Sequence, residues 1–542
     1  MRLLDVETMR EVEAQANSAG TTYAEMMQRA GTGLAESIDS TFGSAAEKRA
    51  LGLVGAGNNG GDTLIALAWL AQKGWQSTAY LAKQRFADDA ALKDFLEGGG
   101  KLLLLDQDAD FSLLENALED ATVLLDGLLG TGFQMPLKPE LAMLLSHIKS
   151  YPALPHVVAV DCPSGVDCVT GATAPEAIPA ELTVCMAAVK QGLLQFPAYP
   201  LAGRIEVVDL GLDENLPAWA DNHDEVVTET LAGRILPNRP LDAHKGSFGT
   251  AVLAVGSINY TGAALLSGQA ALRSGVGLVR MAVPGALHGV LAGHLPEAVW
   301  TILPSELGVI SADAVEVLLN GLEGAGALLI GCGWGREETT AEFLRHLLAA
   351  KPGRFSKPAI GFVAGSREES EKRETRLPPL VVDADGLRLL ARLEKWPELL
   401  PPGSVLTPHP GEMAELCGVG TGEIQKNRLE IAREYAQKWN VVLVLKGALT
   451  VIANPEGAVR VIPVATSALA HAGTGDVLAG LITGFLAKGL PADDASTLAA
   501  WLHAQAGLVA EEWAGHAAAV TAGEVVDALG DAYQILAGGE IE

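Results

Sequence analysis

The sequence has few cysteines and few aromatic residues for a chain of 542 residues. The five cysteines are an odd number without Cys-x-x-Cys spacing, at positions Cys162, Cys168, Cys185, Cys332 and Cys417. This distribution argues against a disulfide framework and against a zinc site, and it fits a reducing cytoplasm. Because aromatic residues make up only 5% of a chain that is 49% hydrophobic, Leu, Val and Ala must build the core.

Positive charge is scarce, and long hydrophobic runs are missing. The 38 Lys and Arg residues face 66 Asp and Glu residues, and the net charge of −28 disfavours binding to nucleic acid or to an anionic membrane. No run of about 18 uncharged apolar residues occurs, and the first residues are charged without an apolar signal region. We therefore expect a soluble cytoplasmic protein that holds any anionic ligand with local amides and a few cations.

Short β-rich apolar runs alternate with longer helical segments, a pattern typical of parallel sheets covered by helices. A polar, proline-containing stretch interrupts this pattern, so we expect α/β domains over 1–213 and 240–542, joined by a linker over 214–239. The strands expected in the first domain are 50–54, 76–81, 123–125, 157–160, 182–186 and 205–208. Those expected in the second are 250–255, 278–283, 327–330, 380–382, 405–407, 441–446 and 450–453. The charged stretch 366–376 is expected to be a solvated loop.

A glycine-rich loop follows the first of these strands. Gly55, Gly57 and Gly60 satisfy Gly-x-Gly-x-x-Gly and lead into Asp62 and an expected helix. Such a loop lets backbone amides approach a phosphate at a helix N-terminus. The next strand ends without the carboxylate that ordinary dinucleotide-binding domains use to hold a ribose. Phosphate contact is therefore expected here, but the ordinary NAD-binding mode is not.

Polar residues follow two further strands of the first domain. Asp126 ends one strand, and Asp161 and Ser164 follow the next. Because strand ends of a doubly wound sheet gather in one crevice, these residues should meet the loop 58–62 there. Any one of them alone is more often a turn former, but three such strand ends together favour a site. Their oxygen atoms suit a hard cation beside an anionic ligand.

Residues 1 to about 213 resemble the N-terminal epimerase domain of the bifunctional NAD(P)H-hydrate repair enzymes, which has a Rossmann-like three-layer α/β/α fold. The matching segments are 23–31, 57–62, 126–132, 160–167 and 190–192. The resemblance implies that hydrated NADH or NADPH (NADHX or NADPHX) contacts Asn58, Asn59, Gly60, Gly61, Asp62, Gly130, Thr131, Gly132, Phe133, Gln134, Met135, Pro136 and Asp161. It also implies a K⁺ site at Asn59, Asp126 and Ser164. Asp161 is our candidate acid/base for interconversion of the two epimers.

The second domain carries Gly473-Thr474-Gly475-Asp476 at the expected start of an apolar helix. Glycines and a helix N-terminus offer amides to a phosphate, and Asp476 can accept a proton from an attacking hydroxyl. Taken alone, this run fits a glycine-rich helix cap equally well. Further strand ends carry small or polar residues at 331–335, 383–387, 407–413 and 446–450.

The order of these motifs resembles the ribokinase-like fold and, more closely, its ADP-dependent NAD(P)HX dehydratase branch, over about residues 240–535. The resemblance implies that Ala263, Gly333, His409 and Asp476 face the hydrated dinucleotide. It implies that ADP, or the product AMP, contacts Lys446, Gly447, Ala448, Leu449, Thr450 and Gly475. Glu412 is a candidate Mg²⁺ ligand, and His409 stands where sugar kinases of this fold carry Asn, which favours the dehydratase.

We therefore expect an enzyme that epimerises (R)- and (S)-NAD(P)HX and dehydrates (S)-NAD(P)HX to NAD(P)H, converting ADP to AMP and phosphate. Its expected catalytic residues are Asp476 in the dehydratase and Asp161 in the epimerase. Two alternatives stay open: a ribokinase-type kinase of a small alcohol or vitamin precursor, and an N-terminal domain that is only a binding module or scaffold. The expected partners are small molecules, and the expected assembly is a homo-oligomer.

Overall fold

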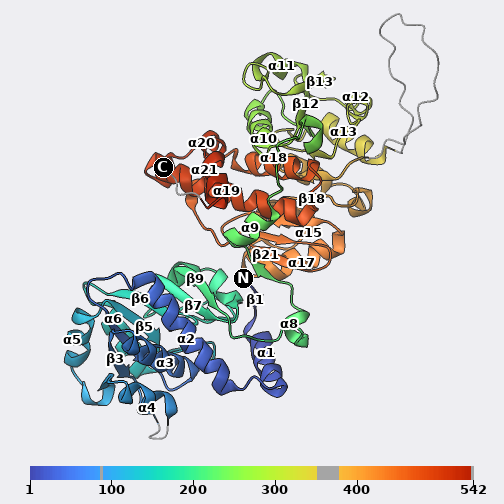
Figure 1. The fold of residues 1–542 in the computed structure, drawn as a ribbon. Coiled ribbons are helices and arrows are strands. Elements are labelled where there is room, and N and C mark those ends of the chain that lie inside the picture. Colours follow the sequence, from blue (N-terminus) through green and yellow to red (C-terminus); the bar gives the residue numbers. More distant parts are fainter. Residues whose placement is uncertain (86–88, 351–376, 539–542) are drawn as a thin grey trace, which may run out of the picture. The chain divides into compact units, whose positions relative to one another are not determined.

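The computed structural model describes residues 1–85, 89–350 and 377–538 (Figure 1). The chain forms two compact units, Met1–Val226 and Val227–Glu542, each of mixed α/β structure. The stretch 366–376, which we expected to be a loop, lies outside the described residues. In the described parts of the chain, no helix is long and apolar enough to cross a membrane.

The described part of the first unit contains a seven-stranded sheet in the order β4-β3-β2-β5-β6-β7-β9, with all neighbours parallel. The strands are β2 (Arg49–Val54), β3 (Gln76–Leu81), β4 (Lys101–Leu104), β5 (Val123–Gly127), β6 (His156–Val160), β7 (Leu182–Met186) and β9 (Arg204–Val208). Each expected strand is confirmed, and β4 is an addition. The chain reverses its direction of progress across the sheet between β2 and β5, where doubly wound sheets form their ligand crevice.

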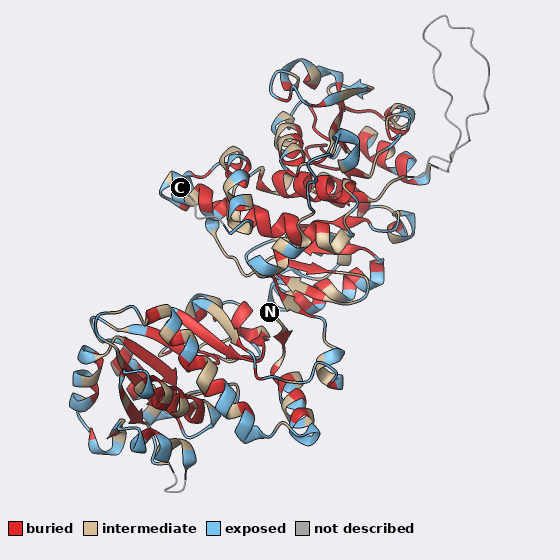
Figure 2. Ribbon diagram, viewed as in Figure 1, coloured by how far each residue is buried: buried red, intermediate tan, exposed pale blue. Residues whose placement is uncertain are grey.

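Helices cover both faces of this sheet. One core cluster includes residues of α1 (Val6–Ala19), α2 (Tyr23–Phe42), α3 (Asn58–Gln72) and α4 (Ala90–Glu97), and another includes residues of α5 (Ser112–Asp120) and α6 (Pro139–Lys149). Alternation along β2 sends Ala50 and Val54 into the first cluster and Leu51 and Leu53 into the second. Figure 2 shows the buried strands and the exposed outer faces of the helices.

A short parallel pair ties the start of the chain to the segment after β7. β1 (Leu3–Leu4) pairs with β8 (Val189–Lys190), and Leu4 lies opposite Lys190. Asp5 caps the following helix α1 by accepting a hydrogen bond from Thr8 N. The pairing therefore brings α1 to the segment that carries Lys190. The unit also contains α7 (Tyr199–Ala202), α8 (Pro217–Ala220) and β10 (Glu225–Val226).

The sheet of the second unit runs in the order β21-β20-β19-β18-β17-β16-β11-β12-β13. Its strands are β11 (Thr250–Ala254), β12 (Leu278–Pro284), β13 (Val299–Leu303), β16 (Ala327–Ile330), β17 (Leu380–Val382), β18 (Val405–Leu406), β19 (Val442–Leu445), β20 (Val451–Ala453) and β21 (Val459–Val461). Pairing is parallel from β13 to β19 and antiparallel beyond. The expected strands are confirmed, and β13 and β21 are additions. A small hairpin is formed by β14 (Ser305–Glu306) and β15 (Val309–Ile310).

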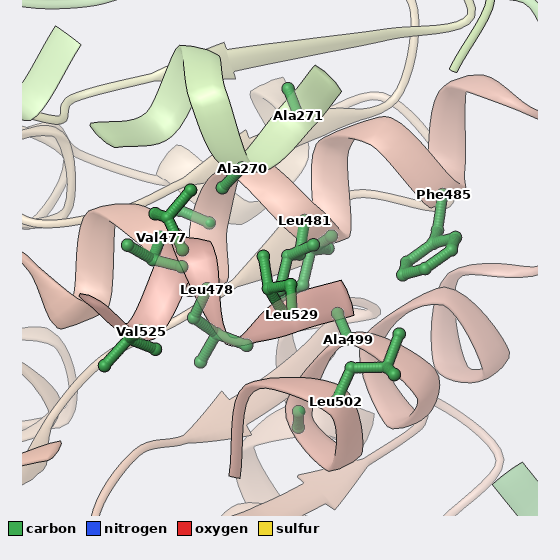
Figure 3. Close-up of a cluster of buried hydrophobic side chains, with 14 of the residues drawn as sticks. Ala270, Ala271, Val477, Leu478, Leu481, Phe485, Ala499, Leu502, Val525 and Leu529 are labelled. Atoms are coloured by element: carbon green, nitrogen blue, oxygen red, sulfur yellow. The ribbon is translucent and has the colours of Figure 1, made fainter. Parts of the chain in front are cut away.

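A layer of apolar helices joins the core on one face of this sheet, as Figure 3 shows in close-up. It contains α10 (Thr261–Arg273), α18 (Thr474–Ala487), α19 (Ala492–Ala514), α20 (Ala522–Asp527) and α21 (Leu529–Leu536). A Cβ at Gly480 would lie against the carbonyl of Ser267, so glycine is needed for the close approach of α18 to α10. The other helices are α9 (Glu229–Ile235), α11 (Gly285–Leu291), α12 (Ala314–Asn320), α13 (Glu338–Ala349), α14 (Asp385–Leu390), α15 (Pro410–Cys417), α16 (Thr421–Lys426) and α17 (Arg428–Trp439).

Candidate active sites

A cavity of about 1400 Å³ opens at the crevice of the first unit. It is lined by the loops after β2 and β5, by residues of α1 and α2, and by Lys190. Most of the residues predicted to contact the hydrated nucleotide line it, namely Asn58, Asn59, Asp62, Gly130, Thr131, Gly132, Phe133, Gln134, Pro136 and Asp161. Gly60 and Gly61 are buried in the first turn of α3, and the side chain of Met135 is exposed.

An arginine side chain fixes the glycine-rich loop through hydrogen bonds to its backbone carbonyls. Helix α3 begins at Asn58 with Gly57 as its N-cap, so its N-terminus lies at the cavity. Arg85 Nη1 donates to the carbonyls of Gly55, at 2.7 Å, and Gly57, at 3.2 Å, while its Nε lies 2.6 Å from Asp89 Oδ2. The guanidinium thus fixes the loop through its carbonyls. A fixed loop beside a helix N-terminus suits the binding of a phosphate.

Asn59, Asp126 and Ser164 meet around Leu129, at the ends of β5 and β6. Ser164 donates to both oxygens of Asp126, from Oγ at 2.5 Å and from N at 2.8 Å, and its Oγ accepts from Leu129 N at 3.0 Å. Asn59 Nδ2 donates to the carbonyls of Leu129 and Val160. Asp126 is fully buried, and burial raises its pKa. Among the described residues no cationic side chain forms an ion pair with it, so these oxygens fit a bound monovalent cation.

Asp161 is held by an ion pair at the floor of the cavity. Its backbone has a φ of +66°, directly after β6. Its Oδ1 accepts from the ammonium of Lys190 and from Met186 N, the latter at 2.9 Å. Lys190 is only 1% exposed; burial is the largest single influence and lowers its pKa, but the charge and hydrogen bond of Asp161, together with the neighbouring Cys185 and Cys168, raise the pKa above its ordinary value. Asp161 therefore has an oriented carboxylate whose charge is compensated.

Two further carboxyl groups lie near this ion pair. Asp62 is 5% exposed, and burial, Asp161 and Glu13 raise its pKa well above the ordinary value. Burial also raises the pKa of Glu13, with a smaller contribution from Asp161. Both side chains line the cavity. The floor of the cavity therefore holds two carboxyl groups whose surroundings favour the protonated form.

In the second unit, strand ends bring a lysine onto an aspartate. Lys446, directly after β19, places Nζ 2.5 Å from Oδ1 of Asp383, which follows β17. Thr407 Oγ1, after β18, donates to the same oxygen at 2.8 Å. Burial lowers the pKa of Lys446, but Asp383 and Glu412 outweigh it and raise the pKa overall. The ammonium thus stays charged at the carboxyl ends of the parallel strands, where it can contact a phosphate.

Asp476 lies in the first turn of α18, close to this ion pair. Its carboxylate, that of Asp383 and the Cys332 thiol have ligand atoms within 4.8 Å of one another. Burial, together with the charge of Asp383, raises the pKa of Asp476 to about 7. Gly473, its neighbour at the N-cap, has a φ of +98°, a conformation that favours glycine. Asp476 therefore has the basicity of a general base at neutral pH, beside the amides of a helix N-terminus.

His409 and Glu412 form a reciprocal cap at the start of α15. His409 Nδ1 accepts from Gly411 N at 3.0 Å, and Glu412 Oε2 accepts from His409 N at 3.0 Å. The Glu412 carboxylate is buried and lies 4.0 Å from Lys446 Nζ. Almost half of the His409 side chain stays exposed. The cap therefore fixes Glu412 beside Lys446 while it leaves imidazole surface accessible to a ligand.

The remaining predicted residues of the second unit lie in two groups. Gly333, with a φ of +63°, adjoins Ala263, because a Cβ at Gly333 would lie 2.7 Å from Ala263 Cβ. Gly475 adjoins Lys446, whose Nζ would lie 3.3 Å from a Cβ at Gly475. The turn after Lys446 contains Gly447, Ala448, Leu449 and Thr450, and Thr450 Oγ1 donates to Gly447 O at 2.9 Å. The residues predicted for ADP and those predicted at the reacting ring therefore share one end of the sheet.

Sequence reasoning gave no role to Glu13, Lys190, Asp383 or Cys332. Lys190 and Asp383 belong to motifs that it recognised, but their partners are distant in sequence. Glu13 lies on a helix whose apolar residues show only that one side is buried, and it reaches the site because β1 pairs with β8. A lone cysteine in a glycine-rich turn carries no signal that it contacts an aspartate.

Two family models match the chain. A model described as NAD(P)H-hydrate dehydratase matches residues 251–356 and 359–529, and one described as YjeF-related protein N-terminus matches residues 23–192. The first model covers the strand ends that carry Asp383 and Lys446 and the first turn of α18, which carries Asp476. The second covers the glycine-rich loop, Asp126 and Asp161.

Curated relatives match along most of their length. The bifunctional NAD(P)H-hydrate repair enzyme Nnr of Moorella thermoacetica is 37% identical over 510 residues, which are 93% of this chain and 91% of that protein. The enzyme of the same name from Escherichia coli is 32% identical, over 91% of this chain and 86% of that protein. A solved structure of the ADP/ATP-dependent NAD(P)H-hydrate dehydratase from Bacillus subtilis, co-crystallised with ATP/Mg²⁺, is 31% identical. It covers 58% of this chain and 99% of that chain, with a TM-score of 0.45.

Proposed function

The chain belongs to the family of bifunctional NAD(P)H-hydrate repair enzymes, and from this we propose the following division of work between its two units. The first unit interconverts the (R) and (S) epimers of NADHX and NADPHX. The second unit dehydrates the (S) epimer to NADH or NADPH and converts ADP to AMP and phosphate. Together the two activities return both epimers to the normal cofactor.

Asp476 is the proposed general base of the dehydration. It takes the proton from the C6 hydroxyl of the hydrated nicotinamide ring, and the hydroxyl oxygen attacks the terminal phosphorus of ADP as AMP leaves. Amides at the N-terminus of α18 stabilise the charge on the transferred group. The ring nitrogen then expels the C6 oxygen as phosphate, and loss of a proton from C5 restores the dihydronicotinamide.

The observation that carries this proposal is the position of Asp476. A carboxylate with a pKa of about 7 lies at a helix N-terminus, beside an ion pair that supplies a positive charge. A hydroxyl nucleophile, a phosphoryl group and a base need this combination. We propose that Gly333, Ala263 and His409 contact the hydrated dinucleotide near its nicotinamide ring. Lys446–Thr450 and Gly475 are proposed to contact ADP.

Mg²⁺ is proposed to accompany the nucleotide at Glu412. Carboxylate oxygens are the protein ligands that Mg²⁺ prefers, and Glu412 is a buried carboxylate beside the proposed phosphate site. When bound, the cation would neutralise phosphate charge. The nearby group of Cys332, Asp383 and Asp476 suits Mg²⁺ less well, because it includes a thiol and because Lys446 already neutralises Asp383.

K⁺ is proposed to bind in the first unit at Asn59, Asp126 and Ser164. The support is the buried carboxyl group of Asp126, which pairs with no cationic side chain of the described residues, and the surrounding carbonyl and hydroxyl oxygens. There the ion would fix the loops after β2, β5 and β6 beside the substrate. Asp161 is proposed to exchange a proton with the C6 hydroxyl group of the substrate during epimerisation. The substrate contacts predicted at 58–62 and 130–136 belong to the same proposal.

One assay separates this function from its alternatives. The protein is incubated with an epimer mixture of NADHX and with ADP, and the absorbance of the reduced nicotinamide ring is followed. We expect complete conversion of both epimers with release of AMP and phosphate. Phosphorylation of a free alcohol by ATP, without repair of NADHX, would indicate a kinase instead. Loss of only the (S) epimer would leave the first unit as a binding module.

We further propose that the protein works in the cytoplasm as a homo-oligomer. The small number of scattered cysteines supports a reducing compartment. Light scattering during size-exclusion chromatography of the full chain measures the assembly, and a mass of 56.3 kDa would identify a monomer.

A further inference from the structure

Asp62 has a carboxyl group that is buried but has no hydrogen-bond donor. It is 5% exposed, and its side chain lines the cavity of the first unit. Among the described residues no N–H or O–H group donates to its carboxyl oxygens. A buried carboxylate without donors is unfavourable, so the protonated acid is the form that this environment stabilises.

The carboxyl group of Asp161 lies near that of Asp62 but, unlike it, accepts hydrogen bonds from described residues. Its Oδ1 accepts hydrogen bonds from both Lys190 Nζ and Met186 N. Its Oδ2 has no donor among the residues that the structure describes, so this oxygen is available to a ligand. The ion pair with Lys190 compensates a negative charge on Asp161, whereas no hydrogen bond from a described residue stabilises a charge on Asp62.

Charged groups from four elements face Asp62. Burial is the largest cause of its raised pKa, followed by the negative charges of Asp161 and Glu13. Lys190 on β8 and Arg85 after β3 act in the other direction but do not cancel them. Two carboxyl groups with opposite environments in one cavity are a common arrangement for paired acid and base catalysis.

We propose that Asp62 is the general acid of the epimerase and that Asp161 is its partner base. This assignment rests on the proposed epimerase function and gives Asp62 a role beyond contacting the substrate. It follows from the cavity and from two groups that accept no hydrogen bond from a described residue, Oδ2 of Asp161 and the carboxyl group of Asp62.

The two groups can open and close the substrate ring without a further reactant. Asp161 accepts the proton of the C6 hydroxyl, and the electrons of that O–H bond form a C6 carbonyl. The C6–N1 bond breaks, its electron pair goes to N1, and N1 takes the proton from Asp62. Rotation about the C5–C6 bond turns the carbonyl, and the reverse steps close the ring on the opposite face. Both protons return to their donors, so the cycle is balanced.

The test compares Asp62→Asn with a matched buried aspartate of the same unit, Asp108→Asn. Asparagine keeps the size of the side chain but cannot transfer the proton, so epimerisation by Asp62→Asn should fall by about 100-fold or more. Because Asp62 accepts no hydrogen bond from the described residues, the melting temperature of the Asp62→Asn variant should not fall below that of the wild type. Asp108 is 2% exposed and accepts from Leu113 N, Leu114 N and Tyr80 Oη. Asp108→Asn should therefore lower the melting temperature and keep epimerisation by the folded protein.

The rate is measured from (R)-NADHX in the presence of excess ADP, so that dehydration by the second unit reports each epimerisation event. In the wild type, epimerisation should also decline as the pH rises through the raised pKa of Asp62, and Asp62→Asn should lack this decline. A wild-type rate in Asp62→Asn, or the same decline with rising pH in this variant, would overturn the assignment. A wild-type protein that consumes only (S)-NADHX would instead refute the proposed epimerase function.

Discussion

Asp476 is an aspartate whose surroundings move its titration to neutral pH. Burial and the charge of Asp383 raise its pKa to about 7, and the proposed mechanism needs the deprotonated form. Below this pH Asp476 is protonated and cannot accept the substrate proton. Dehydration of (S)-NADHX at saturating ADP should therefore rise with pH through about 7 and level off above it. Initial rates across neutral pH measure this profile.

Two variants test whether Asp476 causes this rise of the dehydration rate with pH. Asp476→Asn should lower the rate of dehydration by about 100-fold or more and remove the rise with pH. Glu512→Gln changes an exposed carboxyl in α19 and should keep both the rate and its rise. If Asp476→Asn kept the pH dependence of the wild type, another group would have to be the base.

Asp126 gives a prediction about K⁺ that does not depend on activity. Burial raises its pKa, and no cationic side chain among the described residues pairs with it. A cation that binds only the folded state stabilises it by mass action. Replacing choline chloride by KCl at equal ionic strength should raise the melting temperature of the full chain by a few degrees, on the order of 2–4 °C. Asp126→Asn should abolish the difference, and an equal shift in this variant would exclude Asp126 as a ligand.

At the scale of single elements, the turn after β16 is shaped by a glycine next to α10. Gly333 has a φ of +63°, and its Cβ would lie 2.7 Å from Ala263 Cβ and 2.9 Å from Tyr260 O. Gly333→Ala should strain the turn, at a cost of about 1–2 kcal/mol, and push the start of α10 away from its position. We expect a raised KM for (S)-NADHX and a modest loss of thermal stability. Gly530→Ala, where a Cβ would meet no atom within 4 Å, should leave KM unchanged.

Interior strands could be predicted from the sequence because they are continuous apolar runs bounded by turns. β2, β5 and β6 in the first unit are of this kind, and their positions were found to within two residues. β4 was not predicted because its Lys101-Leu102-Leu103-Leu104 sequence favours helix as much as strand. β13 was not predicted because it is an edge strand. Val299 and Ile302 are exposed, so the strand lacks a continuous buried run.

At the scale of the whole molecule, the strand ends were predictable as sites but the ion pairs between them were not. Parallel topology alone brings Asp126, Asp161 and the loop 58–62 to one crevice. The pairs Lys190–Asp161 and Lys446–Asp383 join residues that are 29 and 63 positions apart. No local pattern specifies them, because they depend on the tertiary positions of β8 and β19. These pairs also compensate the negative charges of Asp161 and Asp383 in the two sites.

The two chemistries can be tested for independence by mixing variants. Asp161→Asn should lose epimerisation and keep dehydration of (S)-NADHX, whereas Asp476→Asn should do the opposite, because the two aspartates belong to different compact units. If the (S) epimer is released between the two steps, a mixture of the two variants should convert (R)-NADHX fully to NADH in the presence of ADP. Asp161→Asn alone should convert (R)-NADHX no faster than uncatalysed epimerisation supplies the (S) epimer. Asp476→Asn alone should not convert it to NADH.

The rate of the mixture distinguishes a shared solution intermediate from direct transfer within one chain. With a free intermediate, the steady rate should equal that of wild-type protein at half the total concentration, after a lag that shortens as Asp161→Asn is added. The lag appears because (S)-NADHX must accumulate before the second unit can use it. Adding a chemically inert protein at equal concentration controls for crowding. A mixture that stayed inactive while each variant kept its own single activity would contradict release and require transfer within one chain.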